Sequence, residues 1–104
     1  MSKRTKNIRH MLLSDFYCTK CSYKGIPIVR TVGQEREPGH LKKIFCLHCQ
    51  QEVNMVEIRP VGKYTLDDFL IEYDNGNFTP DGNRIEPWGT FVAKIRQKGK
   101  NNEE

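Results

Sequence analysis

The chain has 104 residues, carries 17 Lys or Arg against 13 Asp or Glu, and is 37% hydrophobic. This length allows one small domain and argues against two. No apolar run approaches the ~20 residues of a membrane span, and the basic N-terminus lacks the apolar stretch of a signal peptide. We therefore expect a soluble, cytoplasmic protein, in a compartment where disulfides are rare.

Residues 1–15 are predicted to form a basic N-terminal arm. The first ten residues contain four Lys or Arg and no acid, a composition typical of a terminus that is not part of a folded core. The arm gives the chain a positively charged end.

Four cysteines form two C-x2-C pairs that are 24 residues apart. A C-x2-C turn directs both thiolates to one point, and two such turns complete the tetrahedral four-thiolate shell that zinc prefers. A closed shell leaves no position for a reactive water, so the ion is predicted to be structural. Because so small a chain has a thin core, we expect it to depend on one Zn²⁺ for folding. The predicted metal ligands are Cys18, Cys21, Cys46 and Cys49.

The four cysteines could also form disulfides, a redox site or an iron site. Two disulfides would require an oxidising compartment, and a redox C-x-x-C site requires only one pair. Iron also accepts four thiolates, and Tyr17-Cys18-Thr19-Lys20-Cys21 resembles the first metal-binding turn of a rubredoxin, although the second turn lacks the Pro and Gly of that family. With four cysteines present, we expect His48 to point outward and His40 to lie in a loop.

Short strands are predicted around the two cysteine pairs. Residues 25–32 are rich in β-branched side chains, and Pro27 confines this strand to an edge or to its first residues. A polar loop at 33–40 follows, then a strand at 41–45 that enters the second pair and a strand at 53–58 that leaves it. Because a strand follows the first cysteine pair and strands flank the second, residues 16–60 are predicted to be a zinc ribbon, in which short antiparallel strands surround the metal site.

Two short amphipathic helices are predicted in residues 61–98. Thr65 and Asp68 have capping-box spacing, and apolar residues then repeat at helical intervals. Pro87 is typical of the start of a second helix. Residues 99–104 are predicted to be a disordered tail, and the fold class is small α+β. The apolar positions of the helices are Leu66, Phe69, Leu70, Tyr73, Trp88, Phe91, Val92 and Ile95.

The net charge of +4 hides an asymmetry between a basic ribbon and an acidic first helix. Cations beside aromatic residues favour contact with nucleic acid, and an acidic helix face favours a basic protein partner. Solvation of the surface explains the cations equally well. The candidate nucleic-acid contacts are Lys20, Lys24, Arg30, Arg36, Lys42 and Lys43, and the candidate partner contacts are Asp67, Asp68 and Glu72.

The segments Tyr17-Cys18-x-x-Cys21 and Phe45-Cys46-x-x-Cys49 resemble the zinc-ribbon family of transcription and translation factors. The whole chain, through residues 36–43 and Tyr64-Thr65-x-x-Asp68-Phe69, also looks similar to small zinc-ribbon proteins of phages and mobile elements of Gram-positive bacteria. This resemblance implies a zinc site and, for a phage-encoded protein, the host cytoplasm. It implies no activity.

The motifs therefore favour a noncatalytic protein. No nucleophile elbow, P-loop, zinc-protease motif or small-molecule site is recognisable, so we do not expect an enzyme. The function predicted from the sequence is a regulatory or accessory zinc ribbon that binds nucleic acid or a nucleic-acid-handling complex. The alternatives are a protein-interaction module, such as a phage-type modulator of a host protein, and a rubredoxin-like electron carrier.

Overall fold

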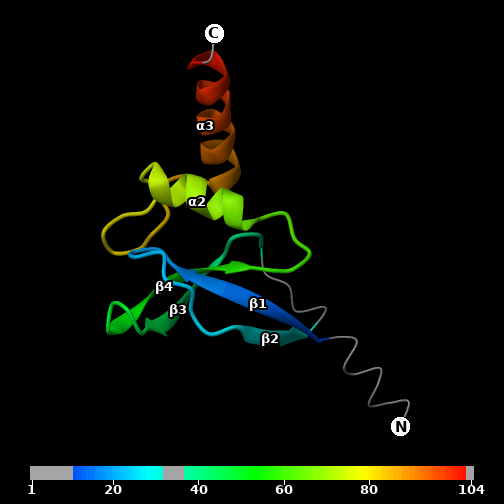
Figure 1. Cartoon of the computed structure of the whole chain (residues 1–104), viewed down its shortest axis with the longest axis vertical. Coiled ribbons are helices and arrows are strands. Elements are labelled where there is room, and N and C mark those ends of the chain that lie inside the picture. Colours follow the sequence, from blue (N-terminus) through cyan, green and yellow to red (C-terminus); the bar gives the residue numbers. More distant parts are fainter. Residues whose placement is uncertain (1–10, 32–36, 103–104) are drawn as a thin grey trace, which may run out of the picture.

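The computed structural model describes residues 11–31 and 37–102, which form a small α+β fold. Four antiparallel strands make one sheet, one helix lies across it, and the last helix projects away from the first (Figure 1). This confirms the predicted fold class at the level of α+β. The elements are β1 (Met11–Cys18), β2 (Ile28–Thr31), β3 (Leu41–Cys46), β4 (Gln51–Ile58), α2 (Leu66–Asp74) and α3 (Trp88–Asn102).

The strand order is β2-β1-β4-β3. The first half of β1 pairs with β2, with Leu13 opposite Val29, and the second half pairs with β4, with Cys18 opposite Met55. Because β1 changes partner halfway along its length, the sheet curls. The hairpin of β3 and β4 closes through the second cysteine pair, with Cys46 opposite Gln51.

The two faces of the sheet hold separate hydrophobic clusters. Met55 and Val56 are adjacent in β4 and point to opposite faces, as successive residues of a strand do. Met55 packs on the face that contains the cysteines, and Val56 packs on the face covered by the helices. The buried members are Phe16, Cys18, Cys46, Val53 and Met55 on the cysteine face, and Val56, Tyr64 and Phe69 on the helix face.

The start of α2 matches the predicted capping box. The Thr65 hydroxyl accepts a hydrogen bond from the backbone N–H of Asp68, and the Asp68 carboxylate accepts one from the backbone N–H of Thr65. The two side chains thus satisfy backbone donors that a helix leaves unpaired at its first turn. The helix ends at Asp74, and Gly76 adopts a positive φ of 81° just beyond it.

The ends of the chain differ from the prediction. Residues 11–15 belong to β1 rather than to the arm, because they gain backbone partners in β2 and β4. The rest of the predicted arm, residues 1–10, lies outside the described residues. Helix α3 continues to Asn102, so a disordered tail beginning at residue 99 is wrong for residues 99–102.

The strand predicted at 25–32 is also shorter in the structure. It begins at Ile28, directly after Pro27. Proline has no backbone N–H to donate to a neighbouring strand, so it marks the point where pairing starts. Among the described residues, neither helix combines the length and the apolar character needed to cross a bilayer.

Candidate metal centre

The four cysteine sulfurs converge at one end of the sheet. All four Sγ atoms lie within 4.8 Å of one another, with 3.8 Å between Cys18 and Cys49 and 3.7 Å between Cys21 and Cys46. These distances are far too long for a disulfide, whose S–S bond is about 2.05 Å. Four sulfurs at the ~2.3 Å zinc–sulfur bond length form a tetrahedron with edges of ~3.8 Å. The thiols thus fit a tetrahedral metal ion.

Strand ends bring the two cysteine turns together. Cys18 ends β1 and Cys46 ends β3, and both strands pair with β4. The residue after Cys18 fastens the first turn to β4, because the Thr19 backbone N–H and hydroxyl both donate to the carbonyl oxygen of Asn54, at 3.1 and 2.9 Å. The pairing of the sheet thereby sets the distance between the turns.

The two turns have the same backbone geometry. The N–H of Ser22 donates to the carbonyl of Cys18 at 2.9 Å, and the N–H of Gln50 donates to the carbonyl of Cys46 at 2.8 Å. Ser22 and Gln50 are also the non-glycine residues of the described chain with positive φ, at 64° and 61°. Each turn therefore bends back in the same way, and it presents its two sulfurs on the inside of the bend.

Hydrogen bonds and burial shift the pKa of Cys46 in opposite directions. Burial favours the neutral form of Cys46, but hydrogen bonds from the backbone N–H of Cys49 and from the Cys21 thiol outweigh it and lower the pKa of Cys46. Burial raises the pKa of Cys21, which faces Cys46. Four facing thiolates would repel one another without a cation between them. A divalent ion would supply that missing charge.

No protein family, curated protein or solved structure matches this chain. The cysteine cluster and the surfaces around it are therefore the basis for a functional proposal.

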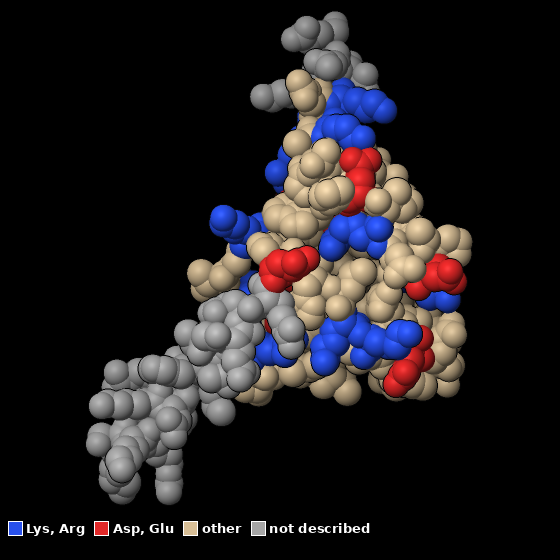
Figure 2. All heavy atoms as spheres, turned by 180° about the vertical axis from the view of Figure 1, so that it is seen from behind, with Lys and Arg blue, Asp and Glu red and all other residues tan. Residues whose placement is uncertain are grey.

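The predicted cationic contacts are dispersed in the structure. Lys20, Lys42 and Lys43 are exposed, but the last two are adjacent in β3 and point to opposite faces. Lys24 is exposed near Asp15, with 3.9 Å between the amine and carboxylate. Figure 2 shows Lys and Arg side chains in several groups, with Asp and Glu side chains between them.

The other two predicted cationic contacts, Arg30 and Arg36, do not add to these exposed lysines. The guanidinium of Arg30 makes two hydrogen bonds to the buried carboxylate of Glu57, at 3.0 and 2.9 Å, so it is engaged inside the protein. Arg36 lies outside the described residues.

The predicted acidic face on α2 is wrong for two of its three residues. Asp68 is 4% exposed and caps the helix, and Glu72 is fully buried and binds Arg84. Only Asp67 of the three is exposed. Helical periodicity placed these acids on one side of the helix, but it carried no information about the cation that comes from a later loop.

An exposed apolar surface beside the metal centre was not predicted. Its side chains are strongly exposed for their type, from 42% for Tyr23 to 70% for Ile26. His48 is exposed as predicted and stacks on Tyr23, with ring centroids 5.9 Å apart. The surface borders a shallow pocket of about 390 Å³ that Lys24 also lines. We call Tyr23, Ile26, Phe45, Leu47 and His48 the turn surface, because three of them lie in or directly before a cysteine turn and Tyr23 lies just after one.

Proposed function

We propose that this chain is a noncatalytic zinc-ribbon protein in which one structural Zn²⁺ supports a nucleic-acid-binding surface. The observation that carries the proposal is the tetrahedral spacing of four free thiols directly beside the turn surface. A four-thiolate site has no open position for catalysis, so the ion would hold the two cysteine turns together. The role would be regulatory or accessory, through the complex that the protein joins.

Both zinc and iron accept four thiolates. We propose zinc because the second cysteine turn, Cys46-Leu47-His48-Cys49, lacks the Pro and Gly of rubredoxins, which use iron for electron transfer. Metal analysis and visible absorbance of the purified protein decide between them, because iron–thiolate protein is coloured and zinc protein is colourless. A strong visible band with stoichiometric iron would overturn the structural-zinc proposal.

The turn surface suits single-stranded nucleic acid. Tyr23, His48 and Phe45 offer exposed rings on which bases can stack, and Lys24, which follows Tyr23 and lines the same pocket, can contact phosphates. Lys43 shares a face of β3 with Phe45 and adds a further cation. Reading of a duplex groove is less favoured, since no described helix presents a row of base-reading side chains.

Fluorescence anisotropy of the zinc-loaded protein with labelled single- and double-stranded DNA and RNA tests this function. We expect preferential binding of single strands that weakens between ~50 and ~200 mM salt, because phosphate contacts release counterions. Tyr23→Ala should weaken binding about 5- to 100-fold, the range expected for one stacked base. Ile85→Ala removes an apolar side chain that is 61% exposed elsewhere in the protein, and it should leave affinity unchanged. Absence of binding at ~50 mM salt would overturn the proposal.

A protein partner is the second candidate function. The aliphatic part of the turn surface favours it, since Ile26 is 70% and Leu47 is 55% exposed and contiguous exposed apolar groups mark interaction sites. Leu47→Glu should then abolish capture of a nucleic-acid-handling complex from host lysate by immobilised protein. Capture that is unaffected by Leu47→Glu would show that the partner does not bind the turn surface.

A further inference from the structure

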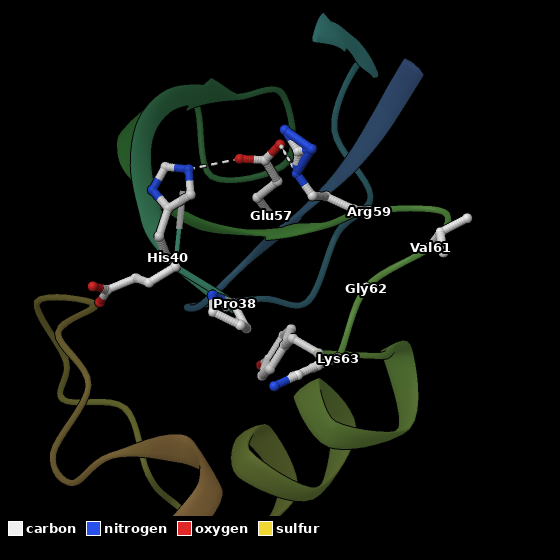
Figure 3. A pocket seen from close by; sticks show the side chains of 10 residues that line it. Pro38, His40, Glu57, Arg59, Val61, Gly62 and Lys63 are labelled. Atoms are coloured by element: carbon white, nitrogen blue, oxygen red, sulfur yellow. Dashed lines mark hydrogen bonds and ion pairs between the residues drawn. The ribbon is translucent and has the colours of Figure 1, made fainter. Parts of the chain in front are cut away.

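A second pocket lies at the opposite end of β4 from the cysteines (Figure 3). Glu57, near the end of β4, is part of the pocket lining, whereas Cys46 lies opposite the first residue of that strand, Gln51. Its volume is about 230 Å³. Its lining includes Pro38, His40, Glu57, Arg59, Lys63 and Tyr64.

The buried carboxylate of this pocket is already neutralised. The Glu57 side chain is 2% exposed and accepts hydrogen bonds from Arg30 Nε at 3.0 Å and Arg30 Nη2 at 2.9 Å. His40 Nε2 lies 2.6 Å from Oε1 of the same carboxylate and donates to it. Figure 3 shows His40 and Arg59 on either side of Glu57. Arg30 and His40 thus satisfy Glu57 without help from Arg59.

Arg59 is left with unused hydrogen-bond donors. Its Nε is 3.8 Å from Glu57 Oε2, too long for a hydrogen bond, and its Nη2 is buried without a partner in the part of the chain that the structure describes. The side chain is 14% exposed. A desolvated guanidinium with unpaired N–H groups is unfavourable, and an anion placed against it would relieve that cost. Lys63 adds a second cation to the pocket lining, and Glu37 adds one exposed carboxylate.

The walls of the pocket are held in place. Gly39 has a positive φ of 72°, and a Cβ at that position would lie 2.8 Å from the Tyr64 ring, so only glycine allows this close approach. Arg84 Nη1 donates to the carbonyl of Gly39 at 2.7 Å and fixes the loop to the helical half of the protein. A pocket with fixed walls loses little conformational freedom when it binds a ligand.

We propose that this pocket binds a small oxyanion, a carboxylate or a phosphate monoester, carried on a short apolar group. Guanidinium donors match the paired oxygens of both anions, and Arg59 is the guanidinium with donors to spare. Pro38, Val61 and the Tyr64 ring provide apolar walls for the rest of the ligand. The volume is below the ~300 to 1,000 Å³ of sites for drug-sized ligands, so the ligand is small.

Three probes that share one ring test the proposal by titration of the ¹⁵N-labelled, zinc-loaded protein. Phenyl phosphate and benzoate carry the two candidate anions, and benzyl alcohol is the neutral control. We expect at least one anion to shift the amide signals of Gly39, Gly62 and Tyr64 with at least tenfold higher affinity than the alcohol. The stronger of the two anions identifies the oxyanion class.

Substitutions separate a specific site from general attraction to a basic protein. Arg59→Gln and Lys63→Gln should each weaken binding of the preferred anion, by about tenfold or more for Arg59, whereas Arg59→Lys should retain part of the affinity. Lys98→Gln removes one exposed charge from α3 and should change nothing. Equal affinity for the alcohol, or unchanged binding after both Arg59→Gln and Lys63→Gln, would overturn the proposal. Neither result depends on whether the turn surface binds nucleic acid.

Discussion

Each cysteine turn places a residue with a side chain where glycine is usually favoured. Ser22 and Gln50 adopt φ values of 64° and 61°, a region that costs non-glycine residues about 1 kcal/mol or more. The tight bend at each turn requires this conformation, because the following chain must return to the sheet. Both residues therefore hold local strain that strand pairing and, as proposed, metal binding offset.

Ser22→Gly should stabilise the metal-loaded protein. Glycine relieves the positive-φ strain, although it also gains freedom in the unfolded chain, so we expect an increase of up to about 1 kcal/mol in the free energy of unfolding. Chemical denaturation with zinc in excess measures it. Ser22→Val is the control and should destabilise, because a β-branched side chain is least tolerant of this region. Equal stability of the two variants would show that the turn is not strained.

Glu57 gives the fold a defined response to acid. Burial acts to raise its pKa, but hydrogen bonds led by those from Arg30 outweigh burial and lower the pKa from 4.5 to about 2. A carboxyl group with a depressed folded-state pKa stabilises the fold above its unfolded value. That contribution is lost as the pH falls from about 4.5 toward 2.

Glu57→Gln should therefore lower stability by roughly 3 kcal/mol near neutral pH, because a pKa lowered from 4.5 to about 2 corresponds to that free energy. The difference between wild type and variant should shrink as the pH falls below 4.5. Acid also releases metal from thiolates, but it does so in both proteins, so the difference isolates Glu57. A difference that grows on acidification would contradict the assignment.

Among the elements, α2 is joined to the rest of the protein by a buried polar network. The Glu72 carboxylate accepts hydrogen bonds from Tyr64 Oη at 2.6 Å, Asn77 Nδ2 at 2.6 Å and Arg84 Nε at 2.7 Å. Burial, followed by the contact with Glu72, raises the pKa of Tyr64, so its hydroxyl remains a donor. The network ties the helix to the segment before it and to the loop after it.

Glu72→Ala should destabilise the protein by about 3 to 5 kcal/mol, because it leaves the partly buried Arg84 without its anion. Asp67→Ala removes an exposed acid from the same helix and should cost less than about 1 kcal/mol. Thermal or chemical unfolding of both variants at one zinc concentration gives the comparison. Similar losses in the two variants would mean that Glu72 is a surface residue, contrary to the structure.

Local signals made parts of these elements predictable. The capping box and the apolar spacing of α2 lie within one short segment. The two strands that flank the second cysteine pair are also close to each other in the sequence. Strand β1 was missed, because its first half is paired only with β2 and its second half only with β4, both far away in the sequence. The burial of Glu72 was missed for a similar reason, since its cation, Arg84, arrives from twelve residues further along the chain.

At the scale of the whole molecule, local sequence signals again predict one site, the cysteine cluster, and miss the turn surface and the pocket. The cysteine cluster was predictable because C-x2-C spacing fixes two ligands locally and the chemistry of four thiolates is specific. The turn surface and the distant pocket were not, since each combines side chains from separate strands and loops that only the folded sheet brings together. Residues such as Arg59 carry no sequence signal until their neighbours are known.

The fold is expected to depend on a metal ion at the cysteine cluster. The cysteine-side cluster contains Cys18 and Cys46 themselves among its buried members, with only Phe16, Val53 and Met55 as buried hydrocarbon or thioether partners. A cluster this small offers little hydrophobic stabilisation by itself. Structural zinc contributes about 10 to 16 kcal/mol in comparable peptides, which exceeds the total stability of most small domains.

Removal of zinc with a strong chelator should therefore unfold the sheet and, through the contacts of Val56 and Tyr17 with Phe69, release α2 as well. Circular dichroism and amide NMR spectra should show loss of strand and helix signals together, and added zinc should restore them. Cys49→Ser, which leaves three thiolates, should lower metal affinity and give an intermediate chelator sensitivity. Lys98→Gln serves as the control with normal sensitivity. A native spectrum that persists after complete metal removal would show that the two hydrophobic clusters hold the fold without zinc.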